Sequence, residues 1–110
     1  MIPDKCHDAH DCAPSTADAW FQHLMTRVFA GRDWRAGRLA VVLTADENDG
    51  AAGNTVLTAV IHPSQNHHVV TAALTHYSLT RFYEQVTHTA YLGHAGTAPS
   101  LAAAFGVPVR

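Results

Sequence analysis

Two short runs of β-branched and apolar residues constrain the fold of this chain more than any other feature. They cover residues 39–44 and 55–61, and turn-forming residues bound both. A continuous apolar run without alternation is typical of a strand covered on both faces, as in a parallel sheet. Two such strands are too few for a doubly covered sheet. The pattern therefore predicts a sheet that needs further strands from outside this chain.

Helical periodicity flanks these runs. Ser15 or Thr16 can cap a helix that ends at Gly31, and a second helix begins at His76. The apolar residues expected on the inner faces of these two helices are Ala17, Trp20, Phe21, Leu24 and Val28, then Leu79, Phe82, Tyr83 and Val86. We expect residues 100–105 to form a last short helix and the segments between these elements to form loops. The order helix, strand, strand, helix indicates the α/β class.

Composition excludes several classes of protein. The chain has 110 residues, 47% of them apolar, which suits one compact domain. Its formal net charge is −2 and its seven Lys and Arg are scattered. Without a basic stripe to neutralise a run of phosphates, nucleic acid is not expected as a partner. No apolar stretch approaches the roughly 20 residues that cross a bilayer, and the first residues contain no signal-peptide core.

The first candidate site is an acidic pair at the end of the first predicted strand. Asp46 and Glu47 follow Thr44 directly, and a glycine-bearing segment comes after them. Ligands of open α/β sheets gather beyond the carboxyl ends of the strands, and a turn here would let both carboxylates converge. Paired carboxylates repel each other unless a cation compensates, and oxygen ligands suit a hard divalent metal. The alternative is a solvated acidic loop.

The second candidate site is the N-terminal segment, where two cysteines enclose alternating histidines and aspartates. These residues are Cys6, His7, Asp8, His10, Asp11 and Cys12. The imidazoles and carboxylates offer metal or phosphate contacts, although short His-rich tracts also occur as solvated surface. For the cysteines, a disulfide in an oxidising compartment competes with a pair of thiolate metal ligands.

The third candidate is His76, at the expected start of a helix. A helix N-terminus favours anions through its free N–H groups and its dipole, so this residue is well placed to meet a phosphate. The alternative is that His76 only caps the helix.

Four segments of the sequence, in order, resemble a known family. They are residues 3–12, residues 39–54 with the core Thr44-Ala45-Asp46-Glu47, residues 74–81 and residues 98–106. Together they are similar to the metal-dependent phosphoesterases of the alkaline phosphatase superfamily, which include bacterial acid phosphatases and non-specific phospholipases C. The acid-phosphatase-like actinobacterial branch is the most similar, because Asn48 follows the acidic pair where the phospholipase branch commonly has a histidine.

The resemblance implies that residues 1–110 are the C-terminal portion of a single phosphoesterase domain with a partial alkaline-phosphatase-like sheet and flanking helices. It implies metal-assisted hydrolysis of a phosphorylated small molecule or a phospholipid head group. The Ser or Thr nucleophile and the N-terminal half of the domain are expected upstream, outside this chain, so the chain alone is expected to be inactive. The full-length parent is expected to be secreted or extracytoplasmic.

By the same resemblance, Asp46 and Glu47 are ligands of a divalent metal of unknown identity, and Cys6 and Cys12 form a disulfide. The residues implied to contact phosphate or a second metal are His76, His7, Asp8, His10 and Asp11.

Two other functions compete with this interpretation. One is a small, non-catalytic metal-binding or scaffold protein that uses the His/Asp/Cys loop. The other is a pH-responsive binding module, which rests only on the presence of nine histidines.

Overall fold

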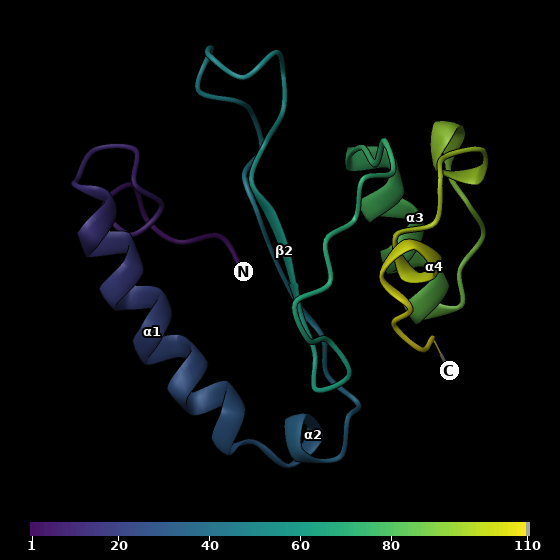
Figure 1. The fold of residues 1–110 in the computed structure, drawn as a ribbon, viewed down its shortest axis with the longest axis horizontal. Helices are drawn as coiled ribbons and strands as arrows, with labels where there is room; N and C mark the ends of the chain where they lie inside the picture. The colour runs from purple at the N-terminus through teal and green to yellow at the C-terminus, as the bar shows by residue number, and fades with distance from the viewer. Residues whose placement is uncertain (110) are drawn as a thin grey trace. The chain divides into compact units, whose positions relative to one another are not determined.

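The computed structural model describes residues 1–109. These residues form two compact units, Met1–Leu39 and a second unit that begins at Ala40. Figure 1 follows the chain through both units.

The first unit contains α1 (Pro14–Ala30) and the single-turn helix α2 (Arg32–Arg35). Helix α1 begins slightly earlier than predicted, because Pro14 occupies its first turn, where the fixed φ of proline suits a helix and no N–H is needed. It ends before Gly31, as predicted. The segment that holds α2 was predicted to be a loop, since one helical turn is too short to show periodicity.

Helix α1 buries one residue deeply. Met25 is 5% exposed, and the residues predicted for the apolar face of α1 are half-buried. Near the end of α1 the ring of Phe29 packs on Trp34 of α2, with 4.7 Å between ring centroids. The turn after α2 is closed by Arg38, whose Nη2 donates to Asp33 Oδ1 at 2.7 Å. Aromatic packing therefore holds α2 against the end of α1, and the ion pair fixes the turn that follows α2.

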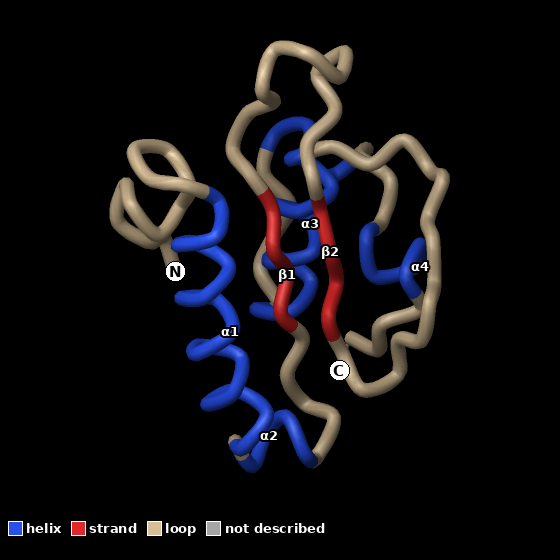
Figure 2. Tube along the Cα trace, turned by 60° about the vertical axis from the view of Figure 1, so that its left-hand side comes forward, coloured by secondary structure: helices blue, strands red, loops and turns tan. Residues whose placement is uncertain are grey.

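The second unit contains the only sheet in the described residues, formed by β1 (Val41–Thr44) and β2 (Thr58–Ile61). The two strands pair antiparallel, with Val41 opposite Ile61 and Thr44 opposite Thr58 (Figure 2). The predicted parallel arrangement is wrong for this pair. Parallel neighbours need a long crossover, usually a helix, whereas the segment between β1 and β2 contains no helix and turns the chain straight back.

Three helical segments follow the sheet: α3 (His76–Thr87), the 3₁₀ helix η1 (Gly93–Gly96) and α4 (Leu101–Phe105). Helix α3 begins at His76, as predicted, and a capping box between Thr75 and Ser78 satisfies its first N–H groups. Helix α4 begins after Ser100, whose Oγ accepts from the N–H of Ala103 at 3.2 Å.

The core of the second unit lies where α3, α4 and the chain end meet. Its buried members are Phe82, Leu101, Ala102 and Val107, and half-buried residues of β1 and β2 pack against them. The predicted inner face of α3 is partly wrong, because Tyr83 and Val86 are 57% and 50% exposed. The polar residue Glu84 is buried instead, at 6% exposure.

No helix within residues 1–109 has the length and apolar character needed to cross a membrane.

Candidate functional site

The loop after β1 carries the acidic pair Asp46 and Glu47. Both residues are exposed, and the chain turns at this point. The turn is held in part by Asp46, whose Oδ1 accepts a hydrogen bond from the N–H of Glu47 at 3.1 Å. One carboxylate oxygen of Asp46 therefore already accepts a hydrogen bond from the backbone of the next residue.

His76 ties the start of α3 to this loop. Its Nε2 lies 2.9 Å from the backbone carbonyl oxygen of Asp46. A carbonyl oxygen can only accept, so Nε2 carries the hydrogen and donates it. The imidazole therefore contacts the backbone of Asp46, and within residues 1–109 its Nδ1 has no hydrogen-bond partner.

Asp46, Glu47 and His76 line one cleft of about 870 Å³ in the second unit. Its polar side also includes Thr44 and Thr58, whose hydroxyls lie 2.9 Å apart across the β1–β2 ladder. Its apolar lining comprises Val56, Val70, Leu74, Leu79, Leu101 and Phe105. The cleft can therefore take a ligand with a polar head and an apolar body.

Tyr77 is a cleft residue that the sequence analysis did not single out. It follows His76 at the start of α3, lines the same cleft and is 53% exposed. Its ring meets the ring of His94 edge-on, with 5.1 Å between centroids. The position beside His76 was the available signal in the sequence, but the contact with η1 cannot be inferred from spacing.

In the first unit, a disulfide joins Cys6 and Cys12, with their Cα atoms 4.7 Å apart. The loop between them is built on Asp4, whose Oδ1 accepts from the N–H groups of Cys6 and His7, each at 3.1 Å. The same oxygen lies 2.8 Å from Nδ1 of His7. The hydrogen bond from the His7 side chain holds the pKa of the Asp4 carboxyl below its ordinary value of 3.8.

The other three predicted residues of this loop bond to one another. Asp8 Oδ1 accepts from the N–H of His10 at 2.8 Å, and Nδ1 of His10 lies 2.6 Å from Asp11 Oδ1. All three are exposed. Their polar atoms therefore support the local loop structure in this conformation.

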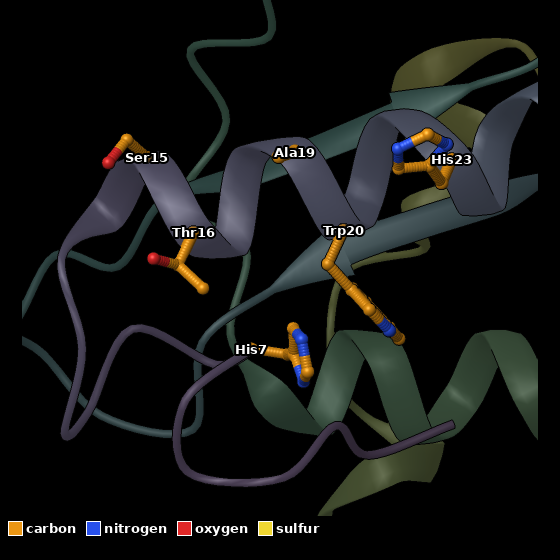
Figure 3. Close-up of a pocket in the computed structure, with 6 residues that line it drawn as sticks. All are labelled: His7, Ser15, Thr16, Ala19, Trp20 and His23. Atoms are coloured by element: carbon orange, nitrogen blue, oxygen red, sulfur yellow. The ribbon is translucent and has the colours of Figure 1, made fainter.

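His7 also lines an open cavity of about 490 Å³ along α1, shown in Figure 3. The ring of His7 faces Trp20, with 5.8 Å between centroids. The remaining lining residues are Ser15, Thr16, Ala19 and His23. The residues that line this cavity include no carboxylate.

The described residues supply only part of a donor set for a divalent metal. Within residues 1–109, no three His, Cys, Asp or Glu side chains gather closely enough to hold a metal ion. Asp46 and Glu47 have the oxygen chemistry that hard cations prefer, but they are two ligands where such sites use six or more oxygens. The disulfide also removes Cys6 and Cys12 as thiolate ligands.

Comparison with known proteins gives one informative match. The chain is 25% identical over 107 residues to phosphatidylinositol-3-phosphatase of Mycobacterium tuberculosis. The match covers 96% of this chain and 35% of the relative, so the chain spans about a third of the relative's length. No protein-family model and no solved structure matches the chain. The chain is thus distantly similar to a phosphatase.

Proposed function

We propose that this chain contributes the Asp46–Glu47 edge of a metal-dependent, acid-phosphatase-like enzyme that hydrolyses phosphate monoesters. The observation that carries the proposal is the shared cleft, which brings Asp46, Glu47 and His76 together from the end of β1 and the start of α3. The distant similarity to a phosphatase, along nearly the whole chain, supports the same chemistry.

In this proposal Asp46 and Glu47 are two of the ligands of a divalent metal. The remaining ligands and the Ser or Thr nucleophile come from a further segment of a longer enzyme, because residues 1–109 do not gather a third ligand. A bound divalent metal supplies positive charge that activates a nucleophile and stabilises a developing oxyanion.

His76 has two tasks in the proposed site. Its Nε2 positions the loop by donating to the carbonyl of Asp46, which leaves Nδ1 as the atom that meets a phosphoryl oxygen. When the ring is protonated, Nδ1 donates a charge-assisted hydrogen bond. His7, Asp8, His10 and Asp11 remain proposed phosphate or second-metal contacts. In the structure described above they stabilise their own loop.

The substrate is proposed to be a phosphorylated small molecule or a phospholipid head group. The relative's name concerns a phosphorylated inositol lipid. The apolar lining of the cleft suits the organic part of such a molecule. The disulfide supports an oxidising, extracytoplasmic location for the parent protein.

The alternative of a non-catalytic metal scaffold is weakened by one observation. The disulfide consumes the two cysteine ligands that it would use. No observation favours it over the phosphoesterase.

A metal titration tests the site. We expect Mn²⁺, added to the ¹⁵N-labelled chain, to broaden the amide signals of Asp46 and Glu47 at the lowest concentrations. The variant Asp46→Asn with Glu47→Gln should lose this effect, whereas the matched variant Asp8→Asn with Asp11→Asn should keep it. Broadening that begins at the Cys6–Cys12 loop and ignores the first variant would contradict the assignment.

A further inference from the structure

Helix α3 buries three polar atoms that have no hydrogen-bond partner within the described residues. They are Arg81 Nε, Glu84 Oε2 and Gln85 Oε1. Positions 81, 84 and 85 are three and four residues apart, so their side chains are neighbours on one face of the helix. Buried polar groups are almost always satisfied, and three on one face require a common explanation.

Other side-chain atoms of Glu84 and Arg81 do have partners. Glu84 is 6% exposed, and its Oε1 accepts from the N–H of Leu92 at 2.9 Å. Arg81 donates from Nη1 to the carbonyl of Ala98, and its guanidinium lies 5.2 Å from the centre of the Tyr91 ring. Arg81 and Glu84 thus clamp the segment that contains η1 onto α3.

The three remaining atoms match the hydrogen-bonding capacity of one water molecule. Arg81 Nε–H is a donor, while Glu84 Oε2 and Gln85 Oε1 are acceptors, and a water accepts one hydrogen bond while donating two. Arg81 and Glu84 form no direct ion pair, although both belong to the part of the chain that the structure describes. Buried polar groups without a direct protein partner are commonly satisfied by an ordered water, which usually makes about two to four hydrogen bonds.

We propose that Arg81, Glu84 and Gln85 enclose an ordered water, and that Glu84 is thereby a positioning residue for the wall of the cleft. The clamp fixes η1, and His94 of η1 packs against Tyr77, which lines the cleft. The orientation of Tyr77 depends on Glu84 through this series of contacts. Its relevance to substrate rests on the proposed function, whereas the water and the clamp are tested without it.

The test uses the 110-residue chain in solution. In the ¹⁵N-labelled chain, Arg81 Nε–H should give a cross-relaxation peak to water and exchange more slowly than Nε–H of the exposed Arg35. Glu84→Ala should lower the protection of the Leu92 amide about tenfold, because it removes that hydrogen bond. It should also shift the ring signals of His94, which report the position of Tyr77.

Glu84→Gln retains an accepting oxygen, so we expect it to restore Leu92 protection to within about threefold and to leave the His94 signals in place. This conservative variant keeps the test decisive if Glu84→Ala does not fold. Val86→Ala, on the exposed side of the same helix, is the matched control and should change neither signal. If Arg81 Nε–H shows no cross-relaxation peak to water, the proposed ordered water is ruled out. Unchanged His94 signals in Glu84→Ala, or displaced His94 signals in Glu84→Gln, overturn the positioning role.

Discussion

The side chain of His76 donates a hydrogen bond from Nε2 to the backbone carbonyl oxygen of Asp46, across 2.9 Å and thirty positions of sequence. This bond joins the first residue of α3 to the loop that follows β1. It sets the local geometry of the proposed site, because the same loop carries both carboxylates.

His76→Ala should therefore loosen the acidic loop. We expect a loss of about 0.5–1 kcal/mol in the free energy of unfolding, at the low end for a hydrogen bond because the residue is exposed. Urea denaturation measures the loss, and amide exchange at Glu47 reports the loop. His23→Ala, an exposed histidine on α1, is the control and should leave amide exchange at Glu47 unchanged. Equal exchange in both variants would show that the His76 bond does not hold the loop.

The disulfide between Cys6 and Cys12 closes a short loop, so its contribution should be modest. The chain-entropy model gives about 2 kcal/mol for a loop of this size. Reduction of the chain should lower the stability of the first unit by that amount, seen as faster amide exchange along α1. A variant with both cysteines replaced by serine should show the faster exchange with or without reductant. A reductant effect that persists in this variant would have another cause.

The Asp4–His7 hydrogen bond predicts an acid-sensitive N-terminal loop. The bond from His7 lowers the pKa of Asp4 in the folded chain. A carboxyl whose folded pKa is depressed contributes stability above its ordinary, unfolded pKa of 3.8, and this contribution disappears as pH falls through the folded pKa. An NMR titration of the Asp4 carboxyl should give a pKa below 3.8, and His7→Ala should raise it. An identical Asp4 titration in both proteins would contradict the assigned cause.

The boundaries of α1, α3 and α4 were largely predictable, because caps, proline and glycine act locally. The pairing of β1 and β2 was not, since an apolar run of residues does not specify which neighbour it meets. The inner face of α3 was missed for a related reason. Tyr83 and Val86 fit an apolar face by spacing, but Arg81 and Glu84 hydrogen-bond to the residues that flank η1. Such contacts depend on tertiary structure that local propensity does not contain.

The candidate site was predictable as a set of residues but not as a set of contacts. Asp46, Glu47 and His76 were identified from their positions at element ends and from a family resemblance. The sequence could not show that His76 bonds the backbone of Asp46, or that both acids of the Cys6–Cys12 loop pair with His10. Side-chain partners of this kind depend on local turn geometry, which composition and spacing leave open.

The 110-residue chain alone should not hydrolyse a generic phosphomonoester, even with divalent metal added. Phosphoryl transfer requires a nucleophile, a metal held by a full set of ligands, and groups that fix the phosphoryl oxygens, all in one geometry. The cleft is lined by two carboxylates and one imidazole, but no three His, Cys, Asp or Glu side chains of the described residues gather closely enough to hold a metal ion. The chain also matches only 35% of the length of its phosphatase relative.

The measurement is a p-nitrophenyl phosphate assay of the purified chain beside a longer protein that adds an upstream nucleophile segment. The longer protein should turn over substrate, and Asp46→Ala should abolish this turnover rather than only raise KM, because it removes stabilisation of the transition state. Asp8→Ala in the same protein distinguishes the cleft from the N-terminal loop. Loss of turnover in this variant would show that the site extends to that loop. Robust turnover by the 110-residue chain, lost on replacing one of its own Ser or Thr residues, would show that the nucleophile lies within these residues and would overturn the proposal.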